Sequence, residues 1–415
     1  MTTIDASLNT RDTKFQTRMV RLGDHVTRIG SGVTPRGGES SYVEAGVPLI
    51  RSMNVHLNRF KPRGLAFITA EQDRTMEVSR VNVDDVLLNI TGASIGRVCV
   101  VPAALVPANV NQHVAVIRSD GSWIPEFLSF YISTPSFQRQ ILADQAGATR
   151  QALTKALIED FEFPLPAADE QRRIVAELTA AFKAVDRARR AAGEQLAAAE
   201  ALPAAYLREV FEGPDAKSWK NVRLAEICEL LPSKSITTNG DAQVTAITTA
   251  CLSESGFRPD GVKSARMRSL DVDACRVRTG EVLIARSNTP DLVGRVSLYA
   301  GDPPEIVASD LTIRLWPRSG LTGRFLTSYL SFMYLAGYWK TRAGGASGSM
   351  KKITRKQISD QTVPLPSPQA QDSIVADIEA RLNSANLLRQ QCIEELAAIN
   401  ALPSAYLRQA FQGLK

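Results

Sequence analysis

Apolar positions recur at helical spacing in two long stretches of the chain. They lie three or four residues apart from Ile174 to Ala192 and, with some breaks, from Ile374 to Ile399. This spacing predicts a narrow apolar seam along a long helix, as in a coiled coil. Some 33 helical residues would span roughly 50 Å, at about 1.5 Å per residue.

Residues that start and stop helices set the expected limits of these stretches. Ser367 offers a capping oxygen and Pro368 suits the first helical position, so we expect the second helix to begin there. Pro203 and Pro403 are expected to end the two helices, because proline removes a backbone donor and clashes with the preceding turn.

The two stretches are copies of each other. PLPAADEQRRIVAELTAAF, from Pro164, matches PLPSPQAQDSIVADIEARL, from Pro364, and ALPAAYLREVFEG matches ALPSAYLRQAFQG. The offset stays at 200 residues, and no residue is inserted or lost. A repeat of this length is too long for a solenoid, so it indicates a duplicated unit made of a domain and a helix.

The rest of each half has a β-like pattern of short apolar runs between Gly, Pro, Asn and Asp residues. In the first half these runs are followed by an aromatic helix expected at residues 125–142. The second half repeats the order, but the offset drifts from 196 (Asp85 to Glu281) to 202 (Leu22 to Leu224). A constant framework that carries different loops is what recognition of two different targets would require.

These patterns predict an α+β protein: two duplicated β-rich α/β units separated by two long antiparallel helices that form a coiled coil. The expected boundaries are a tail at 1–16, one unit at 17–163, a helix and exit turn at 164–213, a second unit at 214–363, and a helix and exit turn at 364–415. A chain of 415 residues agrees with this, because it is too long for one ordinary core.

Composition narrows the choice of function. The formal charge of +6 is compatible with nucleic acid without proving it. The five cysteines are far apart, and they and the three histidines have no spacing from which a zinc site could be built. We expect buried thiols, no metal, no membrane span and a cytoplasmic location.

Catalytic signals are weak. The chain has no nucleotide-binding P-loop motif. SNTPD, which begins at Ser287, resembles the Asn-Pro-Pro-Tyr loop of amino-methyltransferases, but the second proline and the aromatic residue are missing. Asp215 and Lys217 form only an isolated acid-x-Lys pair. Together these absences favour a binding protein without an active site.

Basic and amide side chains are the candidate DNA contacts. Two glycine-started loops, GATRQALTK and GGASGSMKKITRKQ, lie at matching places in the repeat; basic groups there would neutralise phosphates. Their candidates are Thr149, Arg150, Gln151, Lys155, Lys351, Lys352, Arg355 and Lys356. Side chains able to read base edges in the major groove are Arg36, Arg51, Asn54, Arg97, Asn111, Gln112, Arg286, Asn288 and Arg295. For each of these residues alone, a solvated surface position is the simpler alternative.

With the duplication and these loops in view, the chain resembles the DNA-specificity (S) subunit of Type I restriction–modification systems from about Val20 to Gly413. The most specific part of the resemblance is two matching segments, which begin at GATRQALTK and GGASGSMKKITRKQ and run through the Pro-Leu-Pro and the Gln at the start of each long helix. The two LP-x-AYLR-x-x-F motifs at the helix ends also match, as do GASIGRV and GSGVTPRGG. One departure is Pro368-Gln369-Ala370-Gln371, which lacks the glutamate present in the first copy as Glu170.

The resemblance implies a non-catalytic subunit whose globular units are target-recognition domains, each of which reads one half of a split site in double-stranded DNA. Two methyltransferase (M) subunits would dock on the helices, and restriction/translocase (R) subunits would join them. S-adenosylmethionine and ATP would belong to those partners, so no cofactor is expected in this chain. The subunit interface is expected at Gln171, Ile174, Leu178, Tyr206, Phe211, Gln371, Ile374, Ile378, Tyr406 and Phe411.

Two equivalent units in one chain can be related by a pseudo-twofold axis, with the helices antiparallel on it. A helix of roughly 50 Å exceeds one DNA turn of about 34 Å, so two half-sites with an unread spacer would follow. Two other classes stay open at this point: a coiled-coil protein–protein adaptor without DNA specificity, and a stand-alone DNA-modifying enzyme.

Overall fold

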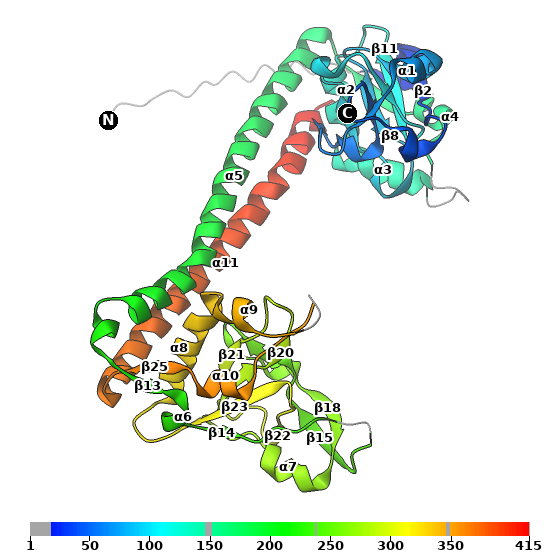
Figure 1. Cartoon of the computed structure of the whole chain (residues 1–415). Coiled ribbons are helices and arrows are strands. Elements are labelled where there is room, and N and C mark those ends of the chain that lie inside the picture. Colours follow the sequence, from blue (N-terminus) through cyan, green and yellow to red (C-terminus); the bar gives the residue numbers. More distant parts are fainter. Residues whose placement is uncertain (1–17, 146–151, 237–238, 346–348, 415) are drawn as a thin grey trace, which may run out of the picture. The chain divides into compact units, whose positions relative to one another are not determined.

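A computed structural model describes residues 18–145, 152–236, 239–345 and 349–414 (Figure 1). The chain divides into two compact units: unit 1 is Met1–Ala191 with Glu395–Lys415, and unit 2 is Ala192–Glu394. The division falls inside both long helices, so each unit contains a part of each helix. Among the described residues, no helix is both long enough and apolar enough to cross a membrane.

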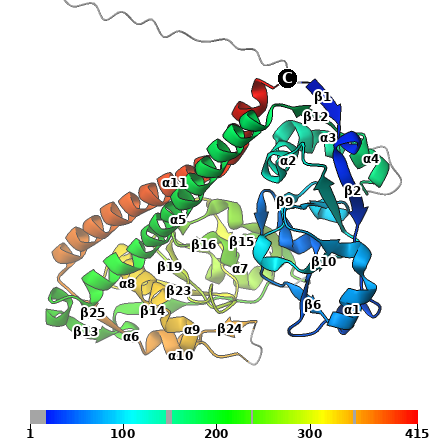
Figure 2. The same ribbon diagram turned by 90° about the horizontal axis from the view of Figure 1, so that it is seen from above.

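The two long helices are α5 (Ala168–Glu212) and α11 (Pro368–Gln412), each of 45 residues. Helix α11 begins at the predicted proline, and the Ser367 hydroxyl accepts a hydrogen bond from the amide of Ala370 at 3.3 Å. Within each unit a part of α5 lies beside a part of α11 (Figures 1 and 2).

The expectation that Pro203 and Pro403 end these helices is wrong, because both prolines lie inside them. Proline removes one hydrogen bond of a helix, but packing of the following residues holds the last turns in place. After Pro203, Leu207 and Phe211 enter the core of unit 2, and after Pro403 the equivalent Leu407 and Phe411 enter the core of unit 1.

In both units the two helices run antiparallel. In unit 1, Ile174 and Leu178 near the start of α5 share a core with Leu407 and Phe411 near the end of α11. In unit 2 the roles exchange: Leu207 and Phe211 of α5 share a core with Val375 and Ile378 of α11. The predicted seam is therefore real, and it merges at each end with the core of a globular unit.

Unit 1 contains two four-stranded sheets, a two-stranded ribbon and a hairpin. The first sheet has the order β2 (Val26–Ser31), β11 (Val114–Ser119), β8 (Val86–Asn89), β9 (Val98–Val100). The second has the order β6 (Ala66–Ile68), β3 (Val47–Ile50), β10 (Ala108–Val110), β7 (Arg80–Val81). The ribbon pairs β1 (Arg18–Arg21) with β12 (Glu162–Leu165), and the hairpin pairs β4 (Val55–His56) with β5 (Arg59–Phe60).

The short helices of unit 1 are α1 (Ala70–Thr75), α2 (Pro125–Ile132), α3 (Pro135–Gln145) and α4 (Lys155–Glu159). The single helix expected at 125–142 is therefore two helices. They are separated just before Pro135, where the proline ring disfavours helical geometry at the preceding residue.

Unit 2 repeats this plan. Its main sheet has the order β14 (Cys228–Leu231), β23 (Thr312–Pro317), β19 (Val282–Ala285), β21 (Val296–Leu298), and a three-stranded sheet has the order β18 (Lys263–Met267), β15 (Ala242–Ala246), β22 (Ile306–Val307). The two-stranded pairs are β13 (Lys220–Arg223) with β25 (Thr362–Leu365), β16 (Leu252–Ser253) with β17 (Gly256–Phe257), and β20 (Ser287–Asn288) with β24 (Lys351–Lys352). Its short helices are α6 (Leu224–Ile227), α7 (Ser269–Cys275), α8 (Gly323–Leu335), α9 (Tyr338–Arg342) and α10 (Arg355–Ser359).

A buried glutamine anchors each long helix to its unit. Gln171 accepts from the amide of Ile124 at 2.9 Å and donates to the carbonyls of Ser122 and Pro166. Gln371 makes the same three bonds, with Thr322, Gly320 and Pro366. Because the second copy keeps every bond, the loss of the glutamate before Gln371 leaves this anchor intact.

Candidate nucleic-acid interface

The structure brings two of the predicted segments of unit 2 together. Strand β20 contains Asn288 of the SNTPD loop, and β24 contains the two lysines of the second basic loop; Asn288 pairs with Lys351, and Ser287 pairs with Lys352. Within the described residues neither lysine has an ion-pair partner, and Lys352 is exposed. Residues opposite each other in a ladder share a face, so Asn288, whose Oδ1 accepts from the amide of Thr289, lies beside Lys351, and Lys352 lies on the other face.

The same juxtaposition exists in unit 1. Thr91, in the loop after β8, forms a bridge with Ala152, which lies within the first basic loop. The Thr91 hydroxyl lies 2.7 Å from Nδ1 of His113, and Nε2 of that ring lies 3.3 Å from the exposed amide of Gln112. Thr149, Arg150 and Gln151 themselves lie outside the described residues.

Several of the predicted readers instead bond within their own unit. Asn54 is buried. Its side-chain oxygen accepts a hydrogen bond from the backbone N–H of Arg51, and its side-chain nitrogen donates one to the carbonyl of Lys61. Arg355 donates to the carbonyls of Leu230 and Leu231, and burial lowers its pKa. These side chains shape the loops, and little of their bonding capacity is left for a ligand.

Other candidates are partly engaged. Arg51 pairs with Glu39 and also donates to the carbonyl of Gly64. Lys155 and Lys356 pair with carboxylates one helical turn away. Four further side chains are engaged. Asn111 accepts from the amide of His113, and Asn288 accepts from the amide of Thr289. Arg286 donates to the carbonyl of Asp310, and Arg295 donates to the hydroxyl of Tyr334 and pairs with Glu254. Arg36 is exposed and Arg97 is half-buried, and neither side chain has a partner in the described part of the chain.

The available groups can therefore bind anions and read hydrogen-bond patterns. Lysines neutralise phosphates, and an Asn or Gln amide can pair with an adenine edge. In the described ranges, no cluster of three or more His, Cys, Asp or Glu side chains could hold a metal ion.

Comparison with known proteins agrees with this chemistry. The sequence pattern of the Type I restriction modification DNA specificity domain matches residues 71–192 and 216–398, one range in each half of the chain, and the two ranges together make up most of it. This chain belongs to that family.

Individual relatives are more distant. A 181-residue segment is 27% identical to the Type I restriction enzyme EcoBI specificity subunit of Escherichia coli; the match takes in 43% of this chain and 37% of that subunit. The fold resembles a chain from a study of complex assembly and conformational transition of the type I R-M system (TM-score 0.74, 23% identity, 95% of this chain and 97% of that one). It also resembles the HsdS subunit from Thermoanaerobacter tengcongensis (TM-score 0.61, 22% identity, 96% and 97%).

Residues assigned to the subunit interface occupy the cores of the two specificity domains. Ile174, Leu178, Phe211, Ile378 and Phe411 are buried, as are both anchoring glutamines, Gln171 and Gln371. Only Tyr206, Ile374 and Tyr406 of that set are half-exposed. Most of these residues therefore join helix to domain within a unit.

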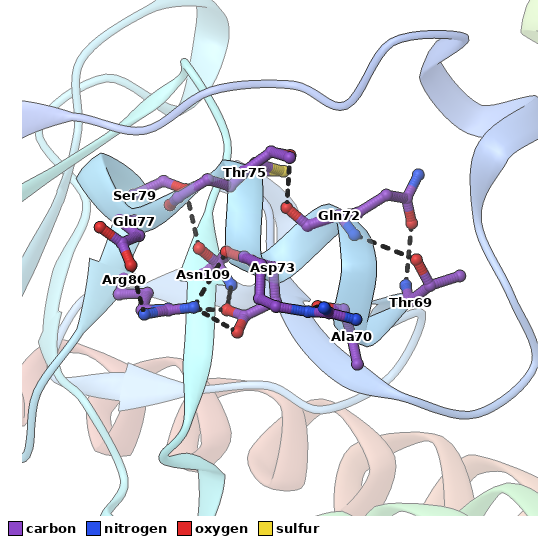
Figure 3. A network of polar contacts seen from close by, with 11 residues as sticks. Thr69, Ala70, Gln72, Asp73, Thr75, Glu77, Ser79, Arg80 and Asn109 are labelled. Atoms are coloured by element: carbon purple, nitrogen blue, oxygen red, sulfur yellow. Dashed lines mark hydrogen bonds and ion pairs between the residues drawn. The ribbon is translucent and has the colours of Figure 1, made fainter.

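Unit 1 contains a polar network that the sequence patterns did not predict (Figure 3). The carboxylate of Asp73 on α1 receives hydrogen bonds from Arg80 and from the amide of Asn109 on β10. The Ser79 hydroxyl donates to the other end of that amide at 2.8 Å. The bonds from Arg80 and Asn109 lower the pKa of Asp73 below its usual value. The network fixes α1 on the sheet, and no periodic signal in the sequence marks it.

An arginine–carboxylate ion pair, which the sequence patterns also did not predict, is present in both units. Arg118 of β11 donates two bonds to the buried Asp85, and Arg314 of β23 does the same to Glu281. The alignment of Asp85 with Glu281 could have predicted this ion pair, because an acidic residue at the start of a buried strand in both copies needs a basic partner in both.

Proposed function

We propose that this chain is the non-catalytic DNA-recognition subunit of a Type I restriction–modification complex, in which each unit reads one half of a bipartite site. The observation that carries the proposal is the match of the specificity-domain pattern to each half of the chain, together with the duplicated juxtaposition of a strand-end loop and a basic loop.

The two units would use different readers. Asn288, opposite Lys351, would serve unit 2, and Gln112, whose amide contacts His113, would serve unit 1. Lysines supply affinity without sequence information, whereas the amides discriminate between bases. The different side chains support the reading of two different half-sites.

Partners and cofactors follow from the same proposal. Two methyltransferase subunits would bring S-adenosylmethionine and supply the methyl transfer, restriction/translocase subunits would use ATP, and the long helices would set the spacer between half-sites. The purified chain alone would neither methylate nor cleave DNA. Its cytoplasmic location remains a prediction.

The decisive experiment is to co-express the chain with the methyltransferase encoded beside it and to map methylated adenines across the genome. We expect one bipartite motif. Asn288→Ala should relax one half-site and Gln112→Ala the other, each by about 1–3 kcal/mol of discrimination. Methylation without a bipartite motif, or methyl transfer by the chain alone, would contradict the proposal.

A further inference from the structure

The duplication allows the two units to be compared position by position, and one difference is a loss of bulk in unit 2. In unit 1, Phe130 of α2 is 6% exposed and packs edge-to-face on Phe182 of α5, with ring centroids 5.4 Å apart. The matched residues in unit 2 are Ser328 of α8 and Leu382 of α11, because Phe127 aligns with Phe325 and Gln171 with Gln371. Two phenyl rings are therefore replaced by a hydroxymethyl group and an isobutyl group.

Two further positions around the same place also become smaller. Arg59 of hairpin β4–β5 forms an ion pair with Asp186 of α5. The matched hairpin β16–β17 has Gly256 at that position. Ile399 of α11 corresponds to Ala199 of α5. All four substitutions remove side-chain volume from one region.

Unit 2 has a cavity of about 460 Å³ in this region. Ser328, Leu382, Gly256 and Ala199 all line it, and every lining residue belongs to unit 2. Its size falls within the range of about 300–1,000 Å³ typical of small-molecule sites, which are largely apolar and contain a few converging polar groups.

The groups around the arginine on the rim of the cavity also differ between the two units. In unit 1, Arg189 donates to Asp186 at 2.8 Å and to Asn400 at 2.7 Å. The matched Arg389 lines the cavity, but Asn386 replaces the aspartate and Glu200 replaces the asparagine. Among the described residues Arg389 has no hydrogen-bond or ion-pair partner, whereas the two other arginines of the lining pair with Glu254 and Glu379.

We propose that this cavity binds a small aromatic acid. The aromatic body of the ligand would fill the space that Phe130 and Phe182 occupy in unit 1, against Leu382 and Val296. Its acidic group would meet the guanidinium of Arg389, in place of the carboxylate that Asp186 gives Arg189, because an arginine fork suits an acidic group in a bidentate contact. Of the predicted DNA contacts only Arg295 lines this cavity; none of the residues of β20 or β24 does.

The test uses two fluorescent probes on the full-length chain: anilinonaphthalene sulfonate, an aromatic acid, and N-phenyl-1-naphthylamine, which lacks the acidic group. We expect the sulfonate to bind saturably at one site per chain. The double variant Ser328→Phe/Leu382→Phe, which restores the residues of unit 1, should abolish binding of both probes.

Two rim variants separate the acidic contact from the apolar one. Arg389→Met should weaken sulfonate binding by about tenfold and leave the neutral probe unchanged. Asn386→Asp, which returns the carboxylate of unit 1, should act in the same direction without filling the cavity, so it also serves if the double variant does not fold.

Absence of saturable binding, or unchanged sulfonate affinity in both rim variants, would overturn the proposal. Stoichiometric displacement of the probe by co-purified methyltransferase would also overturn it, because the cavity would then belong to a protein contact. DNA recognition could still hold in either case.

Discussion

The guanidinium of Arg314 lies 2.7 Å from the carboxylate of Glu281 in unit 2, and both side chains are almost completely removed from solvent, at 1% and 0% exposure. The same guanidinium donates to the carbonyls of Pro232, Ala274 and Arg276. In unit 1 the equivalent Arg118 is 29% exposed and donates two hydrogen bonds to Asp85. A second arginine, Arg28, there donates to the carbonyls of Val78 and Arg80.

Arg314→Met should therefore destabilise unit 2 strongly. It leaves the carboxylate of Glu281 buried without a partner, and breaking such a pair costs about 3–5 kcal/mol. Denaturant unfolding followed by tryptophan fluorescence would measure the loss. Arg258→Gln, which removes a solvent-exposed pair with Asp260, is the matched control and should leave the transition unchanged. Equal effects of the two variants would show that burial does not set the strength of the pair.

The network around Asp73 should make unit 1 sensitive to acid. Because the folded-state pKa of Asp73 lies below its unfolded value of 3.8, its contribution is complete above that value and is lost as the pH falls through the folded pKa. Asp73→Ala also leaves the buried amide of Asn109 without an acceptor, which costs about 1–3 kcal/mol at neutral pH. Unfolding curves at pH 7 and below pH 3.8 should show the difference between variant and parent shrinking in acid; a constant difference would contradict this.

Lys351 and Lys352 should contact the DNA backbone. Replacing both by Gln should weaken binding to all DNA sequences alike and reduce the slope of log affinity against log salt by up to about two units, roughly 0.9 for each lost phosphate contact. Fluorescence anisotropy over a salt series measures this slope. Lys217→Gln, an exposed lysine outside β24, is the control and should keep the parental slope. An unchanged slope in the double variant would remove these lysines from the interface.

The long helices should act as a spacer. Since α5 and α11 lie side by side in each unit, we would insert four residues into both, after Ala191 and after Glu394, where the units divide. Four residues add about 6 Å and nearly preserve the helical phase. At about 3.4 Å per base pair, the methylated motif should keep both halves and gain one or two unread base pairs. Methylation mapping gives the result, and an unchanged spacer in an active protein would show that the helices do not set the distance.

The sequence predicted the framework better than the sites. Duplication, helix start and strand order follow from repeated patterns, which survive because packing requires them. Asn54 and Arg355 have side chains that could bind bases or phosphates, yet both donate hydrogen bonds to backbone carbonyls of their own unit. The sequence alone could not show this, because the tertiary fold decides which of these side chains are buried. The predicted helix end at Pro203 was wrong for a similar reason, because the packing of Phe211 in the core of unit 2 stabilises the helix beyond the proline.

The cavity of unit 2 was beyond sequence reasoning for another reason. Phe130 and Ser328 are both ordinary residues of an amphipathic helix, and neither has a distinctive spacing. Their importance appears only when Phe182 and Leu382 are known to face them.

The aromatic core of unit 1 has a consequence for synthesis of the protein. The ring of Phe411 packs against Phe127 and Tyr131 at 5.3 Å, so the core of the N-terminal unit includes residues that are translated after the whole of unit 2. Unit 2 consists of residues 192–394, so all of its core residues leave the ribosome before Phe411 does. Unit 1 leaves the ribosome first, but its aromatic core stays incomplete until Phe411 has emerged. Unit 2 leaves later and can fold before unit 1 is complete. This order reverses the usual vectorial sequence in which N-terminal domains fold first, and a chain cut at Pro403 would lack the part of the N-terminal unit's core that Leu407 and Phe411 supply.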